Sequence, residues 1–420
     1  EKNFAKLIGT RYAVGVNSGT DALKLSLKTI NLKPGDEVIT AANTFVATVG
    51  AINELGAKTV FVDCDDSFCL DVEKIEKKIT KKTRAIVPVH YSGCAAKMDR
   101  IMKIAKKYEL HVFEDACQSI LGSYKNKNCG TWGLTGSFSF HPLKNINVWS
   151  DGGMIVTNDK LIYKKLLLLR NHGLKNRDQV ELLGFNSRLD TFQSIIGNWL
   201  LPKAKSIATK RIQNANFFDK NFSDIPQIIT PVRSKKIKNV FHLYIVFAEN
   251  RDKLLKYCLK KGIEAKIHYP TPIYRQKPFL QKGYKKGDFP VADYHAKNTI
   301  SFHFSLDTDI NSYLKYRTCT EESRPYQCYE DYSDRDNKDG IWICQGPGCA
   351  KGVITSINPN EISAIDWLGL YKKDINWDGT VDTSYGKRPS FDVVAKAVVP
   401  FHIAVNIFLT SSLFCKKFSK

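Results

Sequence analysis

The first half of this 420-residue chain is predicted to fold as an α/β domain with a largely parallel sheet. From Tyr12 to about Asn158, short apolar runs that suit buried strands alternate with amphipathic stretches of helical period. The composition, 43% hydrophobic and 25% charged, is that of a globular protein. It excludes a mostly disordered chain, a collagen-like fibre and a polytopic membrane protein. At roughly 100–200 residues per domain, we expect two or three domains.

Seven runs are predicted as strands because they are short, apolar and bounded by turn residues. They cover residues 12–16, 37–40, 59–62, 85–89, 111–114, 137–140 and 153–157. Helices are predicted between them at 21–30, 46–55, 71–79 and 100–108. Ligands of such sheets bind at the carboxyl ends of the strands, so functional residues are expected directly after each strand.

A smaller α+β region is predicted to follow. A long helical pattern runs from Leu189 to about Phe222, with a kink or break expected at Pro202. Strands are then expected at 241–247 and 263–269, with a helix over 251–261 between them and Gly262 as its C-cap. We therefore expect a large domain over residues 1–210, a small C-terminal domain over 211–317 and an unassigned tail over 318–420.

The tail differs in character from the rest of the chain. Its cysteines at 319, 328, 344 and 349 suit a small module held by disulfides or zinc, but their spacing fits no standard zinc site. Residues 374–382 resemble the first half of a calcium loop, although Tyr385 stands at the closing position, so an Asx-rich turn is the alternative. The apolar stretch 397–415 contains Pro400, His402 and Asn406, which argue against a membrane anchor. We interpret the tail as a fused module or a non-native extension.

The net charge of +21 lies wholly in the first three quarters of the chain. Residues 318–420 hold 12 Lys and Arg against 13 Asp and Glu, which leaves an excess of +22 in residues 1–317. Such an excess favours an anionic partner, either nucleic acid, a membrane surface or a phosphorylated small molecule. The lysines are scattered in short runs without zinc-finger spacing, an RNA-binding aromatic motif or a basic heptad helix. The pattern therefore disfavours nucleic acid.

The cysteines and histidines of residues 1–317 show no metal-ligand spacing. The six cysteines there, at 64, 69, 94, 117, 129 and 258, are predicted to be free thiols, as is usual in the cytosol. We interpret His90, His242 and His268 as packing or substrate-rim residues and expect no bound metal. No secretory signal opens the chain as printed.

Three candidate catalytic or binding features follow predicted strands. Asp115 follows the fifth strand, where an aspartate is ordinarily a helix N-cap. Lys144 lies in a Pro-containing turn after the sixth strand, where a lysine is usually solvated. Ser18-Gly19-Thr20 joins the first strand to a helix, and this turn suits a phosphate because the helix N-terminus favours an anion.

Together these features match the needs of pyridoxal 5'-phosphate (PLP). A lysine forms a Schiff base with the aldehyde of PLP, and a carboxylate keeps the pyridine nitrogen protonated so that the ring acts as an electron sink. A helix N-terminus binds the phosphate. Each feature alone has an ordinary structural interpretation, but their shared place at strand carboxyl ends favours PLP.

A series of motifs occurs in fixed order along the chain. They are SGTDAL at 18–23, TFVAT at 44–48, EDACQS at 114–119, SFHPLKN at 139–145, DGG at 151–153, NSRLD at 186–190 and IHYP at 267–270. With these motifs, residues 5–317 resemble the DegT/DnrJ/EryC1/StrS family of sugar aminotransferases. The resemblance implies the PLP-dependent transferase fold of aspartate aminotransferase type I, with a mainly parallel seven-stranded sheet and a small α+β domain.

The resemblance also implies roles for individual residues. Lys144 would form the Schiff base and later shuttle a proton between the cofactor carbon and the substrate carbon. Asp115 would pair with the pyridinium nitrogen, and Gln118 would hydrogen-bond the phenolic oxygen of the ring. Phe45 would stack on the ring face, unless it is simply a core residue.

Further roles concern the cofactor phosphate. Gly19, Thr20 and Ser139 would hold it within one subunit. Asn186 would reach across a dimer interface to the phosphate bound by the neighbouring subunit, and Arg188 would help to order that loop. The alternative is that Asn186 is a helix cap and Arg188 a surface charge.

The implied activity is transfer of an amino group from an amino acid, expected to be glutamate, to a keto group of a nucleotide-linked deoxysugar. Retention of Lys144 favours transamination over the dehydration catalysed by relatives with histidine at that position. We expect a cytoplasmic homodimer with shared active sites, acting in polysaccharide (including lipopolysaccharide) or deoxysugar biosynthesis. A non-catalytic PLP-binding regulator and an anion- or nucleic-acid-binding module are the alternatives. The family has a longer segment before the first turn, so part of the substrate pocket is expected to be missing.

Overall fold

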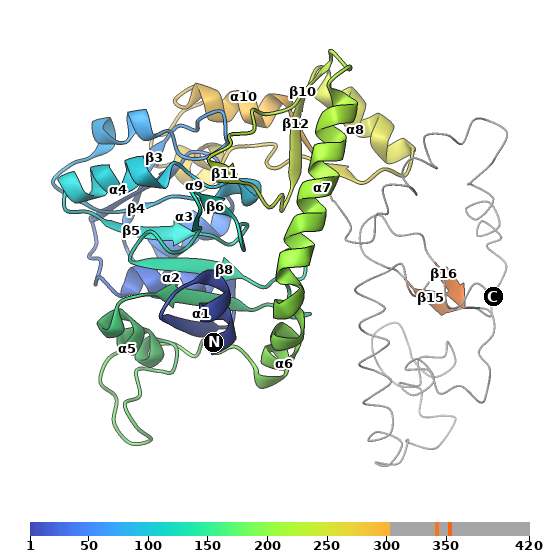
Figure 1. Ribbon diagram of the computed structural model, residues 1–420. Coiled ribbons are helices and arrows are strands. Elements are labelled where there is room, and N and C mark those ends of the chain that lie inside the picture. The colour runs from blue at the N-terminus through green and yellow to red at the C-terminus, as the bar shows by residue number, and fades with distance from the viewer. Residues whose placement is uncertain (303–340, 344–351, 355–420) are drawn as a thin grey trace, which may run out of the picture. The chain divides into compact units, whose positions relative to one another are not determined.

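The computed structural model describes residues 1–302, 341–343 and 352–354 (Figure 1). The chain falls into two compact units, and residues 1–261 and 265–302 belong to the first. In the second unit, β15 (Ile341–Ile343) pairs antiparallel with β16 (Gly352–Ile354). The predictions for cysteines 319, 328, 344 and 349, the loop 374–382 and the apolar stretch 397–415 lie outside the described residues.

The centre of the first unit is a seven-stranded sheet with the strand order β1-β9-β8-β5-β4-β2-β3. Its strands are β1 (Tyr12–Val16), β2 (Glu37–Ala41), β3 (Lys58–Val62), β4 (Thr83–Val87), β5 (His111–Asp115), β8 (Thr135–Ser139) and β9 (Gly153–Thr157). Strand β9 is antiparallel to both neighbours, whereas the other pairs are parallel. The seven predicted strands and their largely parallel arrangement are confirmed, with small shifts at the strand ends.

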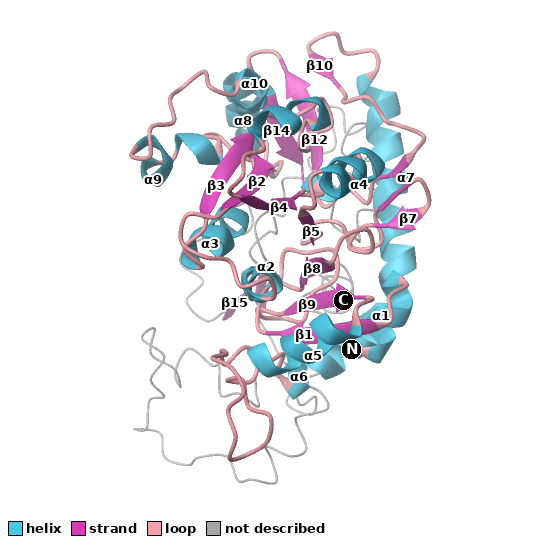
Figure 2. Cartoon of the chain, turned by 90° about the vertical axis from the view of Figure 1, so that its left-hand side faces the viewer, coloured by secondary structure: helices cyan, strands magenta, loops and turns pink. Residues whose placement is uncertain are grey.

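Helices cover both faces of this sheet, as a mainly parallel sheet requires. Helices α2 and α3 lie on one side of the strands, and α1 and α4 lie on the other (Figure 2). Their bounds are α1 (Lys2–Ile8), α2 (Gly19–Lys28), α3 (Val46–Glu54) and α4 (Met98–Lys107). Val112 of β5 belongs to the buried cluster that contains residues of α1 and α4, whereas the next residue, Phe113, belongs to the cluster that contains residues of α2 and α3. Successive residues of β5 therefore face different helix layers.

The prediction of a helix over 71–79 is wrong. The stretch forms two 3₁₀ turns, η1 (Val72–Lys74) and η2 (Glu76–Lys78). Val72 and Ile75 are its well-buried apolar residues, and their three-residue spacing matches one 3₁₀ turn. The carboxylate of Asp71 also accepts a hydrogen bond from the Glu73 N–H and fixes the start of the first turn.

The long helical pattern after Leu189 forms two helices, α6 (Thr191–Leu200) and α7 (Ala204–Phe222). The 3₁₀ turn η4 (Leu201–Lys203) separates them and contains Pro202. Proline has no N–H to donate and clashes with the preceding turn, so the predicted break is confirmed. Helix α7 runs from the large sheet to a smaller one (Figure 1). Residue 210 lies inside α7, and the predicted domain boundaries stay predictions.

The smaller sheet is antiparallel throughout, in the order β10-β12-β14-β13. Its strands are β10 (Ile228–Ile229), β12 (Tyr244–Ala248), β13 (Ala265–Lys266) and β14 (Thr299–Phe302). Helices α8 (Arg251–Lys260) and α10 (Pro290–Asn298) pack beside it, whereas α9 (Lys277–Leu280) contacts the large sheet, where the Phe279 ring lies 4.9 Å from that of Phe61 in β3. A third sheet joins β11 (Ile237–Lys238), β6 (Ser123–Tyr124) and β7 (Lys127–Asn128), and α5 (Lys160–Leu169) follows β9.

Two strands of the smaller sheet are shorter than the patterns 241–247 and 263–269 predict. Strand β12 begins late because Phe241 has a φ of +46° and its N–H donates to the side-chain oxygen of Asn239. Strand β13 ends early, and the chain then approaches the large sheet, where the Tyr91 hydroxyl donates to the carbonyl oxygen of His268 at 2.6 Å. Tertiary contacts therefore override the strand propensity of residues 267–269.

The cysteines at 64, 69, 94, 117, 129 and 258 are free thiols, as predicted. Within the part of the chain that the structure describes, no helix is both long and apolar enough to cross a membrane.

Candidate active site

The predicted catalytic residues meet at the carboxyl edge of the large sheet. Asp115 is the last residue of β5 and Ser139 the last residue of β8, and these two strands are parallel neighbours. Lys144 lies in the turn that follows β8, and Gly19 is the first residue of α2. The sheet therefore brings together a carboxylate, an amine and a helix N-terminus that are far apart in the sequence.

Asp115 is 5% exposed, and each of its carboxylate oxygens has a partner. Oδ2 accepts a hydrogen bond from Thr48 Oγ1 at 2.8 Å, and Oδ1 accepts one from the Cys117 N–H at 3.2 Å. Thr48 Oγ1 also lies 2.8 Å from Thr44 Oγ1. No described helix begins at Asp115, so the ordinary N-cap role does not apply.

Lys144 is half-buried beside this carboxylate. Burial lowers the pKa of its amine, while the charges of Cys117 and Asp115 act in the opposite direction. Burial also raises the pKa of the Cys117 thiol, so Asp115 supplies the negative charge near Lys144 at neutral pH. A lysine with a lowered pKa is more often neutral, and the neutral amine is the nucleophilic form.

The Ser18-Gly19-Thr20 turn forms the expected helix N-terminus. The Ser18 hydroxyl accepts a hydrogen bond from the Asp21 N–H at 3.1 Å and caps α2. A Cβ at Gly19 would lie 2.6 Å from Ser139 Cβ, so glycine is required for this close approach. Gly19 is buried beside Ser139, whereas Thr20 is exposed, and the first N–H groups of α2 lack partners within the helix. The three predicted phosphate-binding residues thus lie together.

Phe45 and Gln118 border the same region. Phe45 precedes α3 and is 49% exposed, so the interpretation of Phe45 as a core residue is wrong. Its ring centroid lies 6.1 Å from that of Tyr269. Gln118 is buried, and its Oε1 accepts a hydrogen bond from the Ser92 N–H at 2.7 Å. Burial and the charge of Asp115 raise the pKa of Tyr269, and a hydrogen bond with Gln118 opposes them.

Asn186 lies outside this cluster. It is exposed and forms a β-bridge with Asn171, whose Oδ1 accepts a hydrogen bond from Arg188 at 2.7 Å. Asn186 is not a helix cap, because Asp190 is the N-cap of α6. Ser187 links this loop to the phosphate turn. Its hydroxyl accepts a hydrogen bond from the Asn17 N–H at 3.3 Å, and Asn17 directly precedes that turn.

His90 belongs to a buried network on the other face of β5. Its Nδ1 accepts a hydrogen bond from the Ala96 N–H at 3.1 Å, so Nε2 carries the proton and donates to Glu114 at 2.9 Å. The Glu114 carboxylate also accepts hydrogen bonds from the backbone N–H groups of Gly130, Trp132 and Gly133. This arrangement gives His90 a packing role.

Sequence reasoning missed three residues of the site. Thr48 and Tyr269 stand in the motifs TFVAT and IHYP, which indicated the region but gave these side chains no role. Cys117 was predicted only to be a free thiol, yet it lies next to both Lys144 and Asp115. The four-residue spacing of Thr44 and Thr48 is the signal that could have paired the two hydroxyls.

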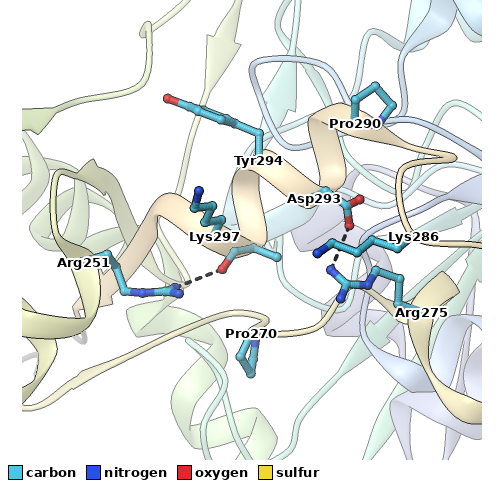
Figure 3. A pocket seen from close by; sticks show the side chains of 9 residues that line it. Arg251, Pro270, Arg275, Lys286, Pro290, Asp293, Tyr294 and Lys297 are labelled. Atoms are coloured by element: carbon cyan, nitrogen blue, oxygen red, sulfur yellow. Dashed lines mark hydrogen bonds and ion pairs between the residues drawn. The ribbon is translucent and has the colours of Figure 1, made fainter.

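A separate cavity of about 430 Å³ lies between α10 and the segment after β13 (Figure 3). None of the predicted site residues lines it. Its walls are basic, but Arg251 donates to the carbonyl oxygens of Ala296 and Thr299, at 3.0 Å each. Arg275, in the 3₁₀ turn η5 (Ile273–Arg275), donates to Asp293 at 3.2 Å. These bonds tie α8 and η5 to α10, which gives both arginines a structural role.

The residues of the sheet edge fit PLP. Burial lowers the pKa of the Lys144 amine, which favours the neutral form that reacts with an aldehyde, and the Asp115 carboxylate retains lone pairs for a ring N–H. The missing Cβ of Gly19 leaves room beside Ser139 and the first N–H groups of α2, which are anion donors.

The sequence model of the DegT/DnrJ/EryC1/StrS aminotransferase family matches residues 1–312. A "pleiotropic regulatory protein" of Geobacillus stearothermophilus is 38% identical over 304 residues, which cover 72% of this chain and 82% of that protein. A dTDP-3-amino-3,4,6-trideoxy-alpha-D-glucose transaminase of Streptomyces venezuelae is 35% identical over 302 residues, 72% of this chain and 80% of the enzyme. The crystal structure of S. venezuelae DesV in complex with a ketimine intermediate matches with a TM-score of 0.73 and 32% identity, covering 80% of this chain and 88% of DesV.

Proposed function

Because the chain belongs to the DegT/DnrJ/EryC1/StrS aminotransferase family, we propose that it transfers an amino group from glutamate to a keto sugar carried on a nucleotide. The family gives the reaction class, which is PLP-dependent transamination. The name of the S. venezuelae transaminase supports a nucleotide-linked sugar as the acceptor. The excess charge of +22 in residues 1–317 suits the diphosphate of such an acceptor. The proposed setting is polysaccharide or deoxysugar biosynthesis in the cytoplasm.

PLP, when bound, supplies an aldehyde that takes up the amino group and a ring that withdraws electrons from the reacting carbon. Lys144 would hold the aldehyde carbon, and Asp115 would hold the ring nitrogen in its protonated form. Phe45 would cover the ring face, and Gln118 would bind the phenolic oxygen. The geometry supports these roles because the four side chains border one region at the sheet edge.

The phosphate of PLP would lie at the start of α2. Gly19 and Thr20 would donate their backbone N–H groups, which precede the first bonds within the helix. Ser139 would add its hydroxyl from the carboxyl end of β8.

Lys144 is also the proposed proton carrier. Its pKa is lowered by burial, so the free amine would be able to carry a proton between the substrate carbon and the cofactor carbon in each half-reaction. A base with a pKa nearer to neutrality exchanges protons in both directions more readily than an ordinary lysine.

The single observation that carries the proposal is the meeting of Lys144 and Asp115 at one sheet edge. The test is an absorption spectrum of the protein with PLP, before and after addition of glutamate. The wild-type protein should show a PLP band that shifts with glutamate. Lys144→Ala should remain folded and lose the shift, whereas Lys164→Ala, at an exposed lysine of α5, should behave as wild type. Retained turnover in Lys144→Ala would refute the assignment.

A non-catalytic PLP-binding regulator is the second candidate, favoured by the name of the G. stearothermophilus relative. A regulator would bind PLP and give a band that glutamate leaves unchanged. The same spectra therefore separate the two functions. A complete half-reaction with glutamate would contradict the regulator.

We further propose a homodimer with shared active sites. Phe192, Ile195 and Trp199 of α6 are 46%, 54% and 41% exposed, and their spacing places them on one helix face. An exposed apolar face of this kind suits a protein partner. Asn186, close to α6 in the sequence, is exposed and therefore accessible to a neighbouring subunit.

A further inference from the structure

We propose that Thr48 is a positioning residue that fixes the Asp115 carboxylate for the ring nitrogen of PLP, and that Thr44 fixes Thr48 in turn. This inference rests on the proposed function, because Asp115 needs such positioning only if it serves PLP. Thr48 acts through Asp115 and is not itself proposed to touch the reacting atoms.

The hydrogen bonds have one direction along this chain of three side chains. An ionised carboxylate only accepts, so the Thr48 hydroxyl donates its proton to Asp115 Oδ2 at 2.8 Å. Having used its proton, the Thr48 oxygen must accept at its contact with Thr44, which is 2.8 Å long. Thr44 is therefore the donor. The chain is ordered as Thr44 to Thr48 to Asp115.

Burial keeps these three side chains in place. Thr44 is 2% exposed, Thr48 is 1% exposed and Asp115 is 5% exposed, so water competes little for these groups. The second carboxylate oxygen is held by the Cys117 N–H at 3.2 Å. With one partner on each oxygen, rotation of the carboxylate would break a hydrogen bond to a buried charged group.

The position of Thr48 in α3 adds a second effect. Thr48 is the third residue of this nine-residue helix, so Asp115 Oδ2 is bonded to the first turn. The N-terminal end of a helix carries partial positive charge and stabilises a nearby anion. The contact that orients Asp115 therefore also places the carboxylate at the positive end of α3.

The alternative is that the Thr48 hydroxyl merely satisfies a buried polar group and has no influence on cofactor recognition. A PLP analogue in which CH replaces the ring nitrogen distinguishes the two. A positioning role concerns the ring nitrogen. Removal of the Thr48 hydroxyl must then weaken the binding of PLP more than the binding of the analogue. A purely structural role would weaken both ligands alike.

The experiment measures dissociation constants of PLP and of this analogue for wild type, Thr48→Val, Thr48→Ser and Thr44→Val. Thr48→Val should weaken the binding of PLP about 10- to 100-fold, the range for a lost hydrogen bond to a charged group. The dissociation constant of the analogue should change less than about twofold. Thr48→Ser keeps the hydroxyl and should match wild type. Thr44→Val should show the same selectivity with a smaller change.

Thermal melting of the PLP-free variants reports on folding. If Thr48→Val does not fold, Thr44→Val carries the test and must still weaken PLP more than the analogue. An equal loss for both ligands, or no loss for either, would overturn the inference. Failure of the wild-type protein to bind PLP at all would instead refute the proposed function on which it rests.

Discussion

Lys144 lies between two opposing influences, burial that lowers its pKa and the charge of Asp115 that raises it. Its amine should therefore lose its proton at a lower pH than an ordinary lysine, for which the reference value is 10.5. We expect the modification of Lys144 by an amine reagent in the PLP-free protein to have its midpoint below that of exposed lysines. Peptide mass spectrometry over a pH series would measure both in one sample.

Removal of the Asp115 charge gives a matched control, because that charge raises the pKa of Lys144. Asp115→Asn removes the negative charge and keeps the shape, so the pKa of Lys144 should fall further and the midpoint should move to lower pH. A midpoint that rose in this variant would show that Asp115 does not act on Lys144.

Gly19 is the residue at which an added methyl group should do most damage to the phosphate turn. Its Cβ would lie 2.6 Å from Ser139 Cβ and 3.1 Å from Cys117 Sγ, and Ser139 Cβ is fixed to the backbone. We expect Gly19→Ala to cost about 1–3 kcal/mol of stability through overpacking and to weaken PLP at least about tenfold. Urea unfolding and PLP titration would measure the two effects.

Gly50→Ala is the control for this variant. Gly50 lies in α3, and no atom is within 4 Å of its added Cβ. Because alanine favours a helix over glycine, this change should stabilise the protein by up to about 1 kcal/mol. Equal effects of the two substitutions would contradict the steric account of Gly19.

Strand β5 and the loop after it are joined by Glu114. Its carboxylate accepts hydrogen bonds from the backbone N–H groups of Gly130, Trp132 and Gly133 and faces Nε2 of His90. In Glu114→Gln an NH₂ group replaces one acceptor oxygen. This NH₂ group is itself a donor and cannot accept hydrogen bonds from the backbone N–H groups that it faces. We expect a loss of about 3 kcal/mol in the free energy of unfolding, as for a broken buried charged network.

Chemical denaturation would measure this loss. Glu181→Gln, at an exposed glutamate, is the control and should change stability by less than about 0.5 kcal/mol. A Glu114→Gln protein as stable as wild type would show that the loop does not depend on this carboxylate.

The elements show what local sequence can predict. The strands of the large sheet were predictable because mainly parallel strands are buried on both faces and therefore apolar. The break at Pro202 follows from the missing N–H of proline. The 3₁₀ turns after Asp71 were not predictable from a helical spacing, since Val72 and Ile75 suit either period. Strand β13 ends early because of the long-range bond from Tyr91 to His268, which local propensity does not contain.

The candidate site was predictable to a similar extent. Motif order indicated Asp115, Lys144 and Gly19, and the sheet brings them together. The hydroxyl of Thr48 on Asp115 was not predictable, because its role depends on how α3 meets the end of β5. The surroundings of Cys117 likewise depend on the packing of α2 against β8.

At the scale of the whole molecule, the apolar face of α6 should control assembly. Ile195→Asp places a charge at the centre of the Phe192, Ile195 and Trp199 face. We expect this variant to be a monomer when the wild type is a dimer, because a buried unpaired charge opposes association. Size-exclusion chromatography with light scattering would measure the mass.

Leu259→Asp is the matched control, since Leu259 is 57% exposed on α8, away from α6 in the sequence. This variant should keep the wild-type mass. If Ile195→Asp also kept it, the α6 face would not be the dimer contact.

Glu114 and Asp115 are consecutive acidic residues whose side chains have partners on different faces of β5. One holds the fold, and the other is proposed to serve the chemistry. In a growing cell, loss of Glu114 would therefore appear as a lower amount of protein, because an unfolded chain is degraded. Loss of Asp115 would leave a normal amount of protein with no product. Two adjacent codons would thus give defects of different origin, one in proteostasis and one in metabolism.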